Sequence, residues 1–323
     1  MSRPTLTVSI NAVVPHLAHD HTEIAGLAAD FEAWGADQLV LGEHLLMGPA
    51  VPHPGASDVD LMIAWPEPFL ALTAAAARTS HVALTTGGVL GAARSAVVVA
   101  KLAATLDAIS GGRFRLGLVP GWYEPEFDAI GVPFEERFER TDELIAVCRA
   151  LWGSQPASFS GRWTSFTDLV LSPPPLRGAD LPIWFGGRGT PATARRVARC
   201  DGWIVSEAAS LDEIQAGMDL IRDACRSQGL PSDEIGVRAT LPRTLRDGVR
   251  TVDLPVEVVC DEAWEALLVR TELGVTDICI PLHSYVADRD AAAVVLADIV
   301  ARLDHQPPTA RERAAASPGD GRA

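Results

Sequence analysis

The sequence contains almost no lysine. Of its 27 basic residues, Lys101 is the only lysine, and the arginines that make up the rest form no basic run. Acidic residues number 42, which gives a formal net charge of −15 at pH 7. Proteins that bind nucleic acids or anionic membranes present basic patches or segments, so this balance argues against both kinds of partner.

Long apolar runs are also missing. No stretch approaches the roughly 20 uninterrupted apolar residues of a membrane-spanning helix, although 48% of the residues are apolar. Residues 1–14 lack the order of charged, apolar and small residues that marks a signal peptide. The five cysteines include no Cys-x-x-Cys pair, which is typical of reduced, buried thiols. We therefore expect a cytoplasmic protein without a membrane segment.

Short β-like runs alternate with helical patterns along most of the chain. Strands are predicted at 5–12, 38–41, 82–86, 114–119, 182–185, 203–205, 235–241 and 276–281. Helices are predicted at 22–34, 67–79, 96–109, 134–152, 191–199, 212–228, 262–273 and 288–303. Eight strand–helix units in this order predict an α/β fold of the (β/α)8 TIM-barrel class, because a doubly wound open sheet usually needs fewer units.

The barrel is predicted to form a single domain over residues 1–304. Periodicity lapses in 153–181, where Ser160-Gly161 stands between β-like residues and Pro173-Pro174-Pro175 follows. A small hairpin and an irregular linker are therefore expected there, as an insertion before the fifth strand. The tail 305–323 has no apolar stripe and is expected to be disordered.

In such a barrel, catalytic groups stand where strands end and loops begin. Glu43 and His44 follow the second strand, Ser206 and Glu207 the sixth, and His283 the eighth. A histidine exchanges a proton near neutral pH, so His44 is a candidate general acid or base, or else a structural histidine. Glu43 is a candidate to orient the His44 imidazole, or to bond backbone groups at the barrel rim.

The segment Gly186-Gly187-Arg188-Gly189-Thr190 follows the fifth strand and leads into a helix. Glycines let the backbone approach a ligand closely, and the helix start offers N–H groups and a positive dipole end. The guanidinium of Arg188 adds a positive charge with paired N–H donors. The segment suits a phosphate, and a tight turn with Thr190 as helix N-cap explains it equally well.

The fourth strand leads into a loop that is rich in aromatic and acidic residues. Trp122 and Tyr123 offer flat faces for an aromatic ring, or pack in the core. Glu124 and Glu126 are spaced as a carboxylate pair of the kind used in glycoside hydrolysis, or else cap the turn before Phe127.

Two familiar kinds of site are not indicated by the sequence. His16, His19 and His21 are residues of metal-binding type, but their spacing matches no zinc pattern, and no metal is expected. No serine or cysteine stands in a Gly-x-Ser-x-Gly nucleophile elbow.

Several strings resemble a known family. They are Leu-Gly-Glu-His at 41–44, Leu-Thr-Thr-Gly-Gly-Val-Leu at 84–90, Asp-Ala-Ile-Ser-Gly-Gly-Arg-Phe at 107–114, Gly-Trp-Tyr-Glu-Pro-Glu-Phe at 121–127, and Pro-Ile-Trp-Phe-Gly-Gly at 182–187 ahead of Asp-Gly-Trp-Ile at 201–204. In this order and at this separation, they are similar to the bacterial-luciferase-like flavin or deazaflavin (F420) oxidoreductases. The resemblance runs from about residue 6 to 303.

The resemblance implies a TIM barrel with a flavin-type ring near its axis. The ring would lie against a bulged strand, often with a non-prolyl cis peptide, at Gly88-Val89. The cofactor phosphate would lie at Gly186 and Gly187 and at the helix that starts near Thr190. His44 would face the reactive edge of the ring. A homodimer is also implied.

The loop after the fourth strand has a counterpart in the family as well. There, Trp122 and Glu126 match residues that border the cofactor side chain. Gly91-Ala92-Ala93 departs from the polar or proline residue that the family often carries after Val-Leu.

Coenzyme F420 and FMN compete as the cofactor. A deazaflavin carries a hydride, whereas reduced FMN activates dioxygen, so the cofactor decides between a reductase or dehydrogenase and a monooxygenase. The arginine bias suggests a GC-rich genome of actinobacterial type, and family members in such organisms often use F420, which favours F420. His44 would then exchange the matching proton on a small organic substrate, with Trp122 walling the pocket.

Three further expectations concern the substrate and the activity. The apolar character of residues 44–66 favours an uncharged substrate. The first alternative to F420 chemistry is an FMN-dependent monooxygenase. The second is a non-catalytic cofactor-binding subunit.

Overall fold

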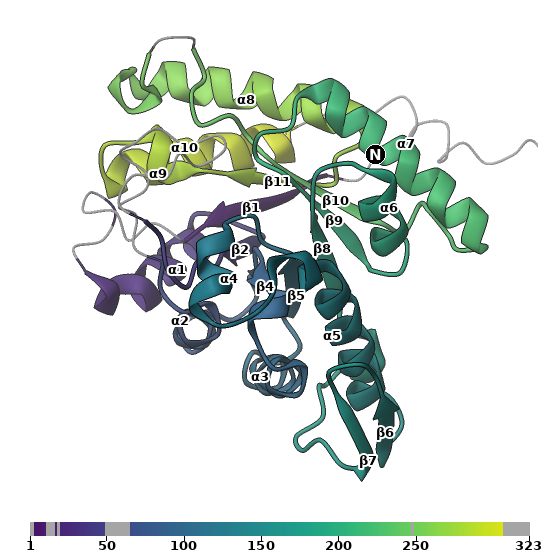
Figure 1. Ribbon diagram of the computed structural model, residues 1–323. Coiled ribbons are helices and arrows are strands. Elements are labelled where there is room, and N and C mark those ends of the chain that lie inside the picture. The colour runs from purple at the N-terminus through teal and green to yellow at the C-terminus, as the bar shows by residue number, and fades with distance from the viewer. Residues whose placement is uncertain (1–2, 11–16, 18–19, 49–64, 247–248, 306–323) are drawn as a thin grey trace, which may run out of the picture.

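The computed structural model describes residues 3–10, 17, 20–48, 65–246 and 249–305. Within these residues, parallel strands close into a barrel in the order β3-β2-β1-β11-β10-β9-β8-β5-β4, and β3 also pairs with β5 (Figure 1). The strands are β1 (Thr5–Ser9), β2 (Gln38–Leu41), β3 (Ala83–Thr86), β4 (Val89–Leu90), β5 (Phe114–Val119), β8 (Ile183–Gly187), β9 (Gly202–Val205), β10 (Gly236–Thr240) and β11 (Asp277–Ile280). Because β3 and β4 are two halves of one bent strand, the predicted eight-stranded TIM barrel is confirmed.

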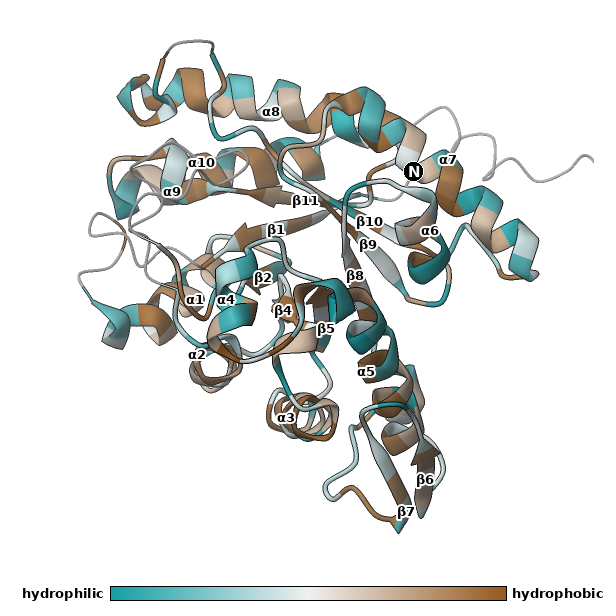
Figure 2. Cartoon of the chain, viewed as in Figure 1, coloured by the Kyte–Doolittle hydropathy of each residue, from teal (hydrophilic) through white to brown (hydrophobic). Residues whose placement is uncertain are grey.

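Helices surround the barrel and cover its apolar strands. They are α1 (Ile24–Ala33), α2 (Pro68–Ala76), α3 (Ala96–Ile109), α4 (Glu124–Ala129), α5 (Arg137–Trp152), α6 (Pro191–Val197), α7 (Leu211–Gln228), α8 (Val256–Leu273), α9 (Leu282–Tyr285) and α10 (Arg289–Asp304). Figure 2 shows polar and apolar residues alternating along the outer helices, as expected when one face packs on the barrel. The short helices α4 and α9 follow β5 and β11 and are additions to the sequence-based expectation.

The bend between β3 and β4 is a bulge of one residue. Thr85 pairs with Arg115 and Val89 pairs with Leu118, so this strand advances four residues while β5 advances three. The Thr86 hydroxyl accepts a hydrogen bond from Gly117 N at 2.8 Å and donates one to Gly117 O at 2.8 Å, which replaces the interrupted ladder. The bulge expected near Gly88 is therefore present. The non-prolyl cis peptide expected there is wrong, since cis bonds within the described residues occur only before Pro156 and Pro173.

Residues between α5 and β8 form a hairpin outside the barrel. Strands β6 (Ala157–Ser160) and β7 (Ser165–Leu169) pair antiparallel, and the hairpin projects beyond the end of α5 in Figure 1. The turn of the hairpin is fixed by Glu143 on α5, whose carboxylate accepts N–H bonds from Trp163 and Thr164 at 3.0 and 2.7 Å.

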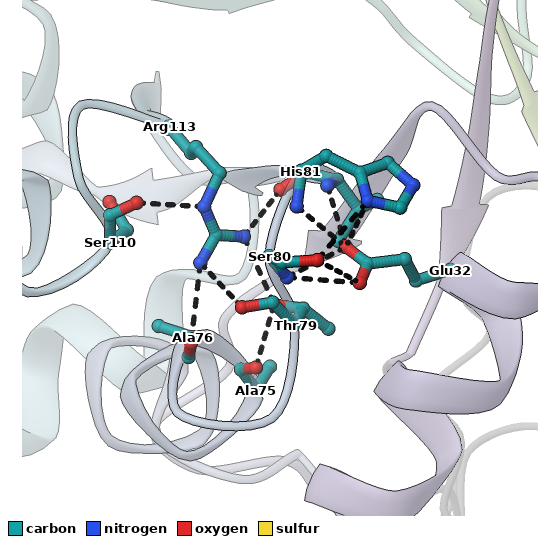
Figure 3. A network of polar contacts seen from close by, with 9 residues as sticks. Glu32, Ala75, Ala76, Thr79, Ser80, His81, Ser110 and Arg113 are labelled. Carbon is teal, nitrogen blue, oxygen red and sulfur yellow. Dashed lines mark hydrogen bonds and ion pairs between the residues drawn. The ribbon is translucent and has the colours of Figure 1, made fainter.

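A polar network fastens the amino-terminal end of the barrel. Glu32 on α1 accepts N–H bonds from Ser80, His81 and Val82 at 2.8–3.0 Å. Arg113, which precedes β5, donates to the carbonyl of Val82 at 2.7 Å, and Figure 3 shows both side chains converging on this turn. Burial by itself raises the pKa of Glu32, but the backbone donors outweigh it and lower that pKa to about 2.

The five cysteines are buried and free, as expected. Burial raises the pKa of Cys200 and Cys279 to about 12, so their thiols are not activated. No helix among the described residues is long and apolar enough to span a membrane. The described part also has no group of three or more potential metal ligands, while His16 and His19 lie outside it. The predicted tail falls outside the described residues from 306 onward.

Candidate active site at the carboxyl end of the barrel

A cavity opens where the barrel strands end. Its volume is about 500 Å³, within the roughly 300–1,000 Å³ of small-molecule sites. Its walls come from the ends of β2, β3–β4, β5, β8 and β9. Of the residues proposed from the sequence, those that line it are Glu43, His44, Gly88, Trp122, Gly186, Gly187, Arg188, Thr190, Ser206 and Glu207. Val89, Glu126 and His283 do not line it.

The bulge explains the position of Val89. Val89 is fully buried in the core, and Leu90 lines the cavity in its place. The extra residue at Gly87-Gly88 shifts the alternation of side chains, so an even-numbered position faces inward after the bend.

His44 and Glu126 form a buried pair at the cavity wall. His44 Nδ1 lies 3.0 Å from Glu126 Oε2, and the two side chains are 7% and 1% exposed. The other carboxylate oxygen, Oε1, accepts N–H bonds from Leu45 and Leu46 at 2.6 and 3.1 Å. With the carboxylate ionised, Nδ1 donates to Glu126, which fixes the orientation of the imidazole.

Helix α4 is what brings Glu126 to His44. The helix follows β5, starts after Tyr123 and carries Pro125 in its first turn, where proline is tolerated. Glu124 is exposed while Glu126 is buried against His44, so the two do not act as a carboxylate pair.

Glu43 points away from the imidazole and fixes the bulged strand. Its carboxylate accepts an N–H bond from Leu90 at 2.7 Å and one from Arg94 Nε at 2.9 Å. Arg94 also bonds Glu67, the N-cap of α2, at 2.9 Å. Burial lowers the pKa of Arg94, but its contacts with Glu43 and Glu67 raise it overall. This arrangement matches the alternative in which Glu43 bonds backbone groups at the rim.

Two tryptophans flank the imidazole edge-on. The ring centroids of Trp65 and Trp122 lie 4.8 and 5.8 Å from that of His44, at interplanar angles of 80° and 83°. Trp122 also contacts Tyr123 at 5.6 Å. The indoles limit the rotation of His44 and leave an apolar surface beside it.

The segment after β8 forms a capped helix start. The Thr190 hydroxyl accepts the N–H of Thr193 at 3.2 Å, which confirms Thr190 as an N-cap. Arg188 is 77% exposed and pairs with Glu213 on α7 at 2.8 Å. The cavity wall here is thus mostly backbone, from Gly186 and Gly187.

A cluster of three polar residues, which the sequence did not indicate as a group, lies at the cavity rim opposite His44. Arg243 bonds Glu207 at 3.0 Å through Nη2 and His283 Nε2 at 3.1 Å through Nη1. Glu207 and His283 were candidates from their positions at strand ends, whereas Arg243 lies in the loop after β10, where no sequence motif marks it.

Fold and cavity together define a (β/α)8 barrel of enzyme type, with a histidine–carboxylate pair at the catalytic end. The chain belongs to the luciferase-like monooxygenase family, whose model matches residues 5–250. The family resemblance seen in the sequence is thereby confirmed.

Relatives by sequence include monooxygenases. The FMNH2-dependent dimethylsulfone monooxygenase of Pseudomonas putida is 33% identical over 162 residues, which is 49% of this chain and 44% of that protein. The pyrimidine monooxygenase RutA of Enterobacter cloacae is 41% identical over 83 residues, 24% of this chain and 23% of that protein. The chain thus spans less than half the length of these enzymes. An uncharacterized Mycobacterium tuberculosis protein is 30% identical over 251 residues, 75% of this chain and 80% of that one.

Solved structures share the fold. An F420-dependent secondary alcohol dehydrogenase, in complex with an F420–acetone adduct, has a TM-score of 0.75 at 16% identity, with 94% of this chain and 99% of that one covered. The monooxygenase RslO1 of Streptomyces bottropensis has a TM-score of 0.73 at 22% identity, with coverages of 92% and 96%. An F420-dependent dehydrogenase and a monooxygenase therefore share this barrel fold.

Proposed function

We propose that the chain is an F420-dependent oxidoreductase that transfers a hydride between the deazaflavin and a small organic substrate. The observation that carries the proposal is the His44–Glu126 pair, which is buried at the wall of a cavity of about 500 Å³. Hydride transfer to or from a carbonyl or alcohol carbon requires a matching proton at oxygen, and His44 is suited to exchange it.

The residues around the cavity fit a flavin-type ring. Gly88 and Gly186 present backbone without a side chain on the two sides of β5, and Trp122 offers a flat apolar surface. When bound, F420 would supply or accept a hydride, whereas reduced FMN would deliver its electrons to dioxygen. Gly187 and Thr190 are the residues proposed to hold the phosphate end, with Arg188 beside them.

Within this proposal the protein residues have distinct tasks. His44 exchanges a proton through Nε2, and Glu126 holds the imidazole and stabilises it when charged. Glu43 is a positioning residue, because it accepts the N–H of Leu90 on the bulged strand directly and is itself held by Arg94. Trp65 and Trp122 limit the access of water to the imidazole.

Titration of the purified chain with F420 and with FMN tests the proposal. Binding would be followed through quenching of tryptophan fluorescence, since Trp65 and Trp122 line the cavity. Tight binding of F420 with turnover supports the proposal. Binding of F420 without turnover by the chain alone would favour a non-catalytic subunit. Light scattering on the same sample tests the homodimer that the family resemblance implies.

A second candidate is an FMN-dependent monooxygenase. It is favoured by the sequence relatives, of which the Pseudomonas putida dimethylsulfone monooxygenase is named as FMNH2-dependent. Tight binding of FMN alone, followed by oxygen consumption with reduced FMN, would select this candidate over F420 chemistry.

A further inference from the structure

A second, smaller cavity lies inside the barrel beside the main one. Its volume is about 60 Å³, and it shares Gly42, Trp65, Gly87 and Glu207 with the main cavity. Its remaining lining residues are Ser9, Val40, Arg238, Thr240, Arg243, Cys279, Pro281 and His283. The space holds about two waters at roughly 30 Å³ each, or one small polar head group.

Arg238 is the charged side chain that determines which ligands this cavity can bind. Its side chain on β10 is 3% exposed, Nε donates to Asp277 at 2.9 Å, and the guanidinium lies 4.9 Å from the centroid of the Trp184 ring. Both terminal nitrogens, Nη1 and Nη2, are buried and have no hydrogen-bond partner among the described residues. Leaving buried donors of a cation unsatisfied is costly, so a ligand or water is expected to meet them.

Charges around Arg238 favour an anion. Arg115, Arg238 and Asp277 meet in one network through Gln38, so two guanidinium groups face one carboxylate. Burial lowers the pKa of Arg115, and the charge of Arg238 lowers it further against the opposite effect of Asp277. Arg243 at the rim is neutralised by Glu207, so the excess positive charge lies in the barrel interior.

We propose that this cavity binds the carboxylate end of the substrate, an inference that rests on the proposed oxidoreductase function. The planar guanidinium of Arg238 offers two parallel N–H donors, a geometry that matches a carboxylate. The rest of the substrate extends past Gly42 and Gly87 toward His44. The substrate is then a small organic acid, and the expectation of an uncharged substrate rested on residues 44–66, of which 49–64 lie outside the described residues.

Calorimetric titration with butyrate and with butyramide tests the proposal, because the two probes match in shape and differ in charge. It is run with and without saturating cofactor. We expect butyrate to bind at least about 10-fold more tightly than butyramide. Arg238→Lys keeps a positive charge near Asp277 but lacks the two parallel N–H donors of the guanidinium. It should weaken butyrate binding by about 10-fold or more.

The matched control is Arg115→Lys, which also changes an arginine in the barrel interior but does not line the cavity. It should leave butyrate binding within about 2-fold. If Arg238→Lys fails to fold, Thr240→Leu is the second variant, because it fills the cavity and should abolish butyrate binding.

Two results would overturn the proposal: equal affinity for the two probes, or no binding of either at millimolar concentration. Arg238 would then be a structural partner of Asp277 alone. The outcome is separate from the proposed function, because absence of F420 and FMN binding overturns that function and leaves the comparison of the two probes intact.

Discussion

Glu126 Oε2 and His44 Nδ1 lie 3.0 Å apart and join the loop after β2 to helix α4 after β5. The contact spans 82 residues of sequence. It fixes the orientation of the His44 imidazole, which the proposed proton transfer requires.

Replacing His44 should remove most turnover. In His44→Ala the group that exchanges the substrate proton is lost, so we expect kcat to fall by about 10²- to 10⁴-fold. Cofactor affinity should stay within a few-fold, since the cavity keeps its walls. His81→Ala, at the opposite end of the barrel, is the control. Unchanged kcat in His44→Ala would mean that the histidine is structural.

Glu126→Gln should lower turnover through His44. The amide preserves an oxygen for Leu45 and Leu46 but removes the negative charge that stabilises the protonated imidazole. We expect kcat to fall by about 10-fold or more with little change in cofactor Kd. Glu124→Gln is a matched control, since Glu124 is exposed on the same helix. Equal losses in both variants would contradict a specific role for Glu126.

Arg188→Ala tests the phosphate end of the cofactor site. If Arg188 meets phosphate, its removal should raise the cofactor Kd by about 10-fold, as expected for a charge-assisted hydrogen bond. Arg195→Ala, which changes an exposed arginine on α6, should have no effect. Glu213→Gln releases Arg188 from its partner and should leave binding equal or tighter. If Arg188→Ala binds the cofactor as the wild type does, Arg188 serves only its pairing with Glu213.

Glu32→Gln should destabilise the fold in a pH-dependent way. The pKa of Glu32 is lowered from 4.5 to about 2, so the carboxylate stabilises the fold above about pH 4.5 and loses this effect as the pH falls toward 2. At pH 7 the variant should lose about 2–3 kcal/mol of unfolding free energy.

Urea unfolding at several pH values measures this difference. The gap between wild type and Glu32→Gln should shrink steadily below pH 4.5. Glu265→Gln, on an exposed face of α8, provides the baseline. A gap that persists unchanged at pH 2 would show that the stabilisation does not come from the charge.

Gly117→Ala should destabilise the barrel at the bulge. A Cβ at Gly117 would lie 2.0 Å from Thr86 O, a backbone atom that cannot yield without moving the bulged strand. We expect a loss of about 2–4 kcal/mol. Gly26→Ala is the contrasting variant. Outside its own helix, the nearest atom to the added Cβ would be Arg289 Nη2 at 3.8 Å, and the variant should gain up to about 1 kcal/mol. Denaturant unfolding measures both changes in unfolding free energy. Equal changes in Gly117→Ala and Gly26→Ala would contradict a destabilising contact at Gly117.

Much of the barrel could be predicted from the sequence. The strands at 38–41 and 114–119 and the helix at 96–109 agree with the structure to the residue, because strong apolar patterns end at turn residues. Helix α8 begins at Val256 rather than at 262, and Pro255 was the missed signal for its start. Helices α4 and α9 have six and four residues, too few to show periodicity.

Many residues of the site could be predicted from the sequence, but the contacts between them could not. The strand-end rule found His44, and the loop after β5 supplied Glu126, but spacing gave no indication that the two would meet. Glu43 was the nearer candidate in sequence, yet successive residues after a strand point in different directions. A bulge was expected near Gly88 from the family resemblance, but the sequence does not show which side chain faces the cavity after it, so Leu90 was missed in favour of Val89.

That bulge makes the length of the chain, as well as the identity of its residues, a determinant of the pocket wall. Between Thr86 and Leu90 the cavity is lined by Gly87 and Gly88, and an added Cβ would crowd Val40 at the first position and Gly117 O at the second. Deleting one of the two glycines would remove the bulge, because this strand would then advance three residues while β5 advances three, and Val89 and Leu90 would stay opposite Leu118 and Val119. The change would alter the peptide edge of the cavity wall, whereas the side chains beyond it would keep their faces.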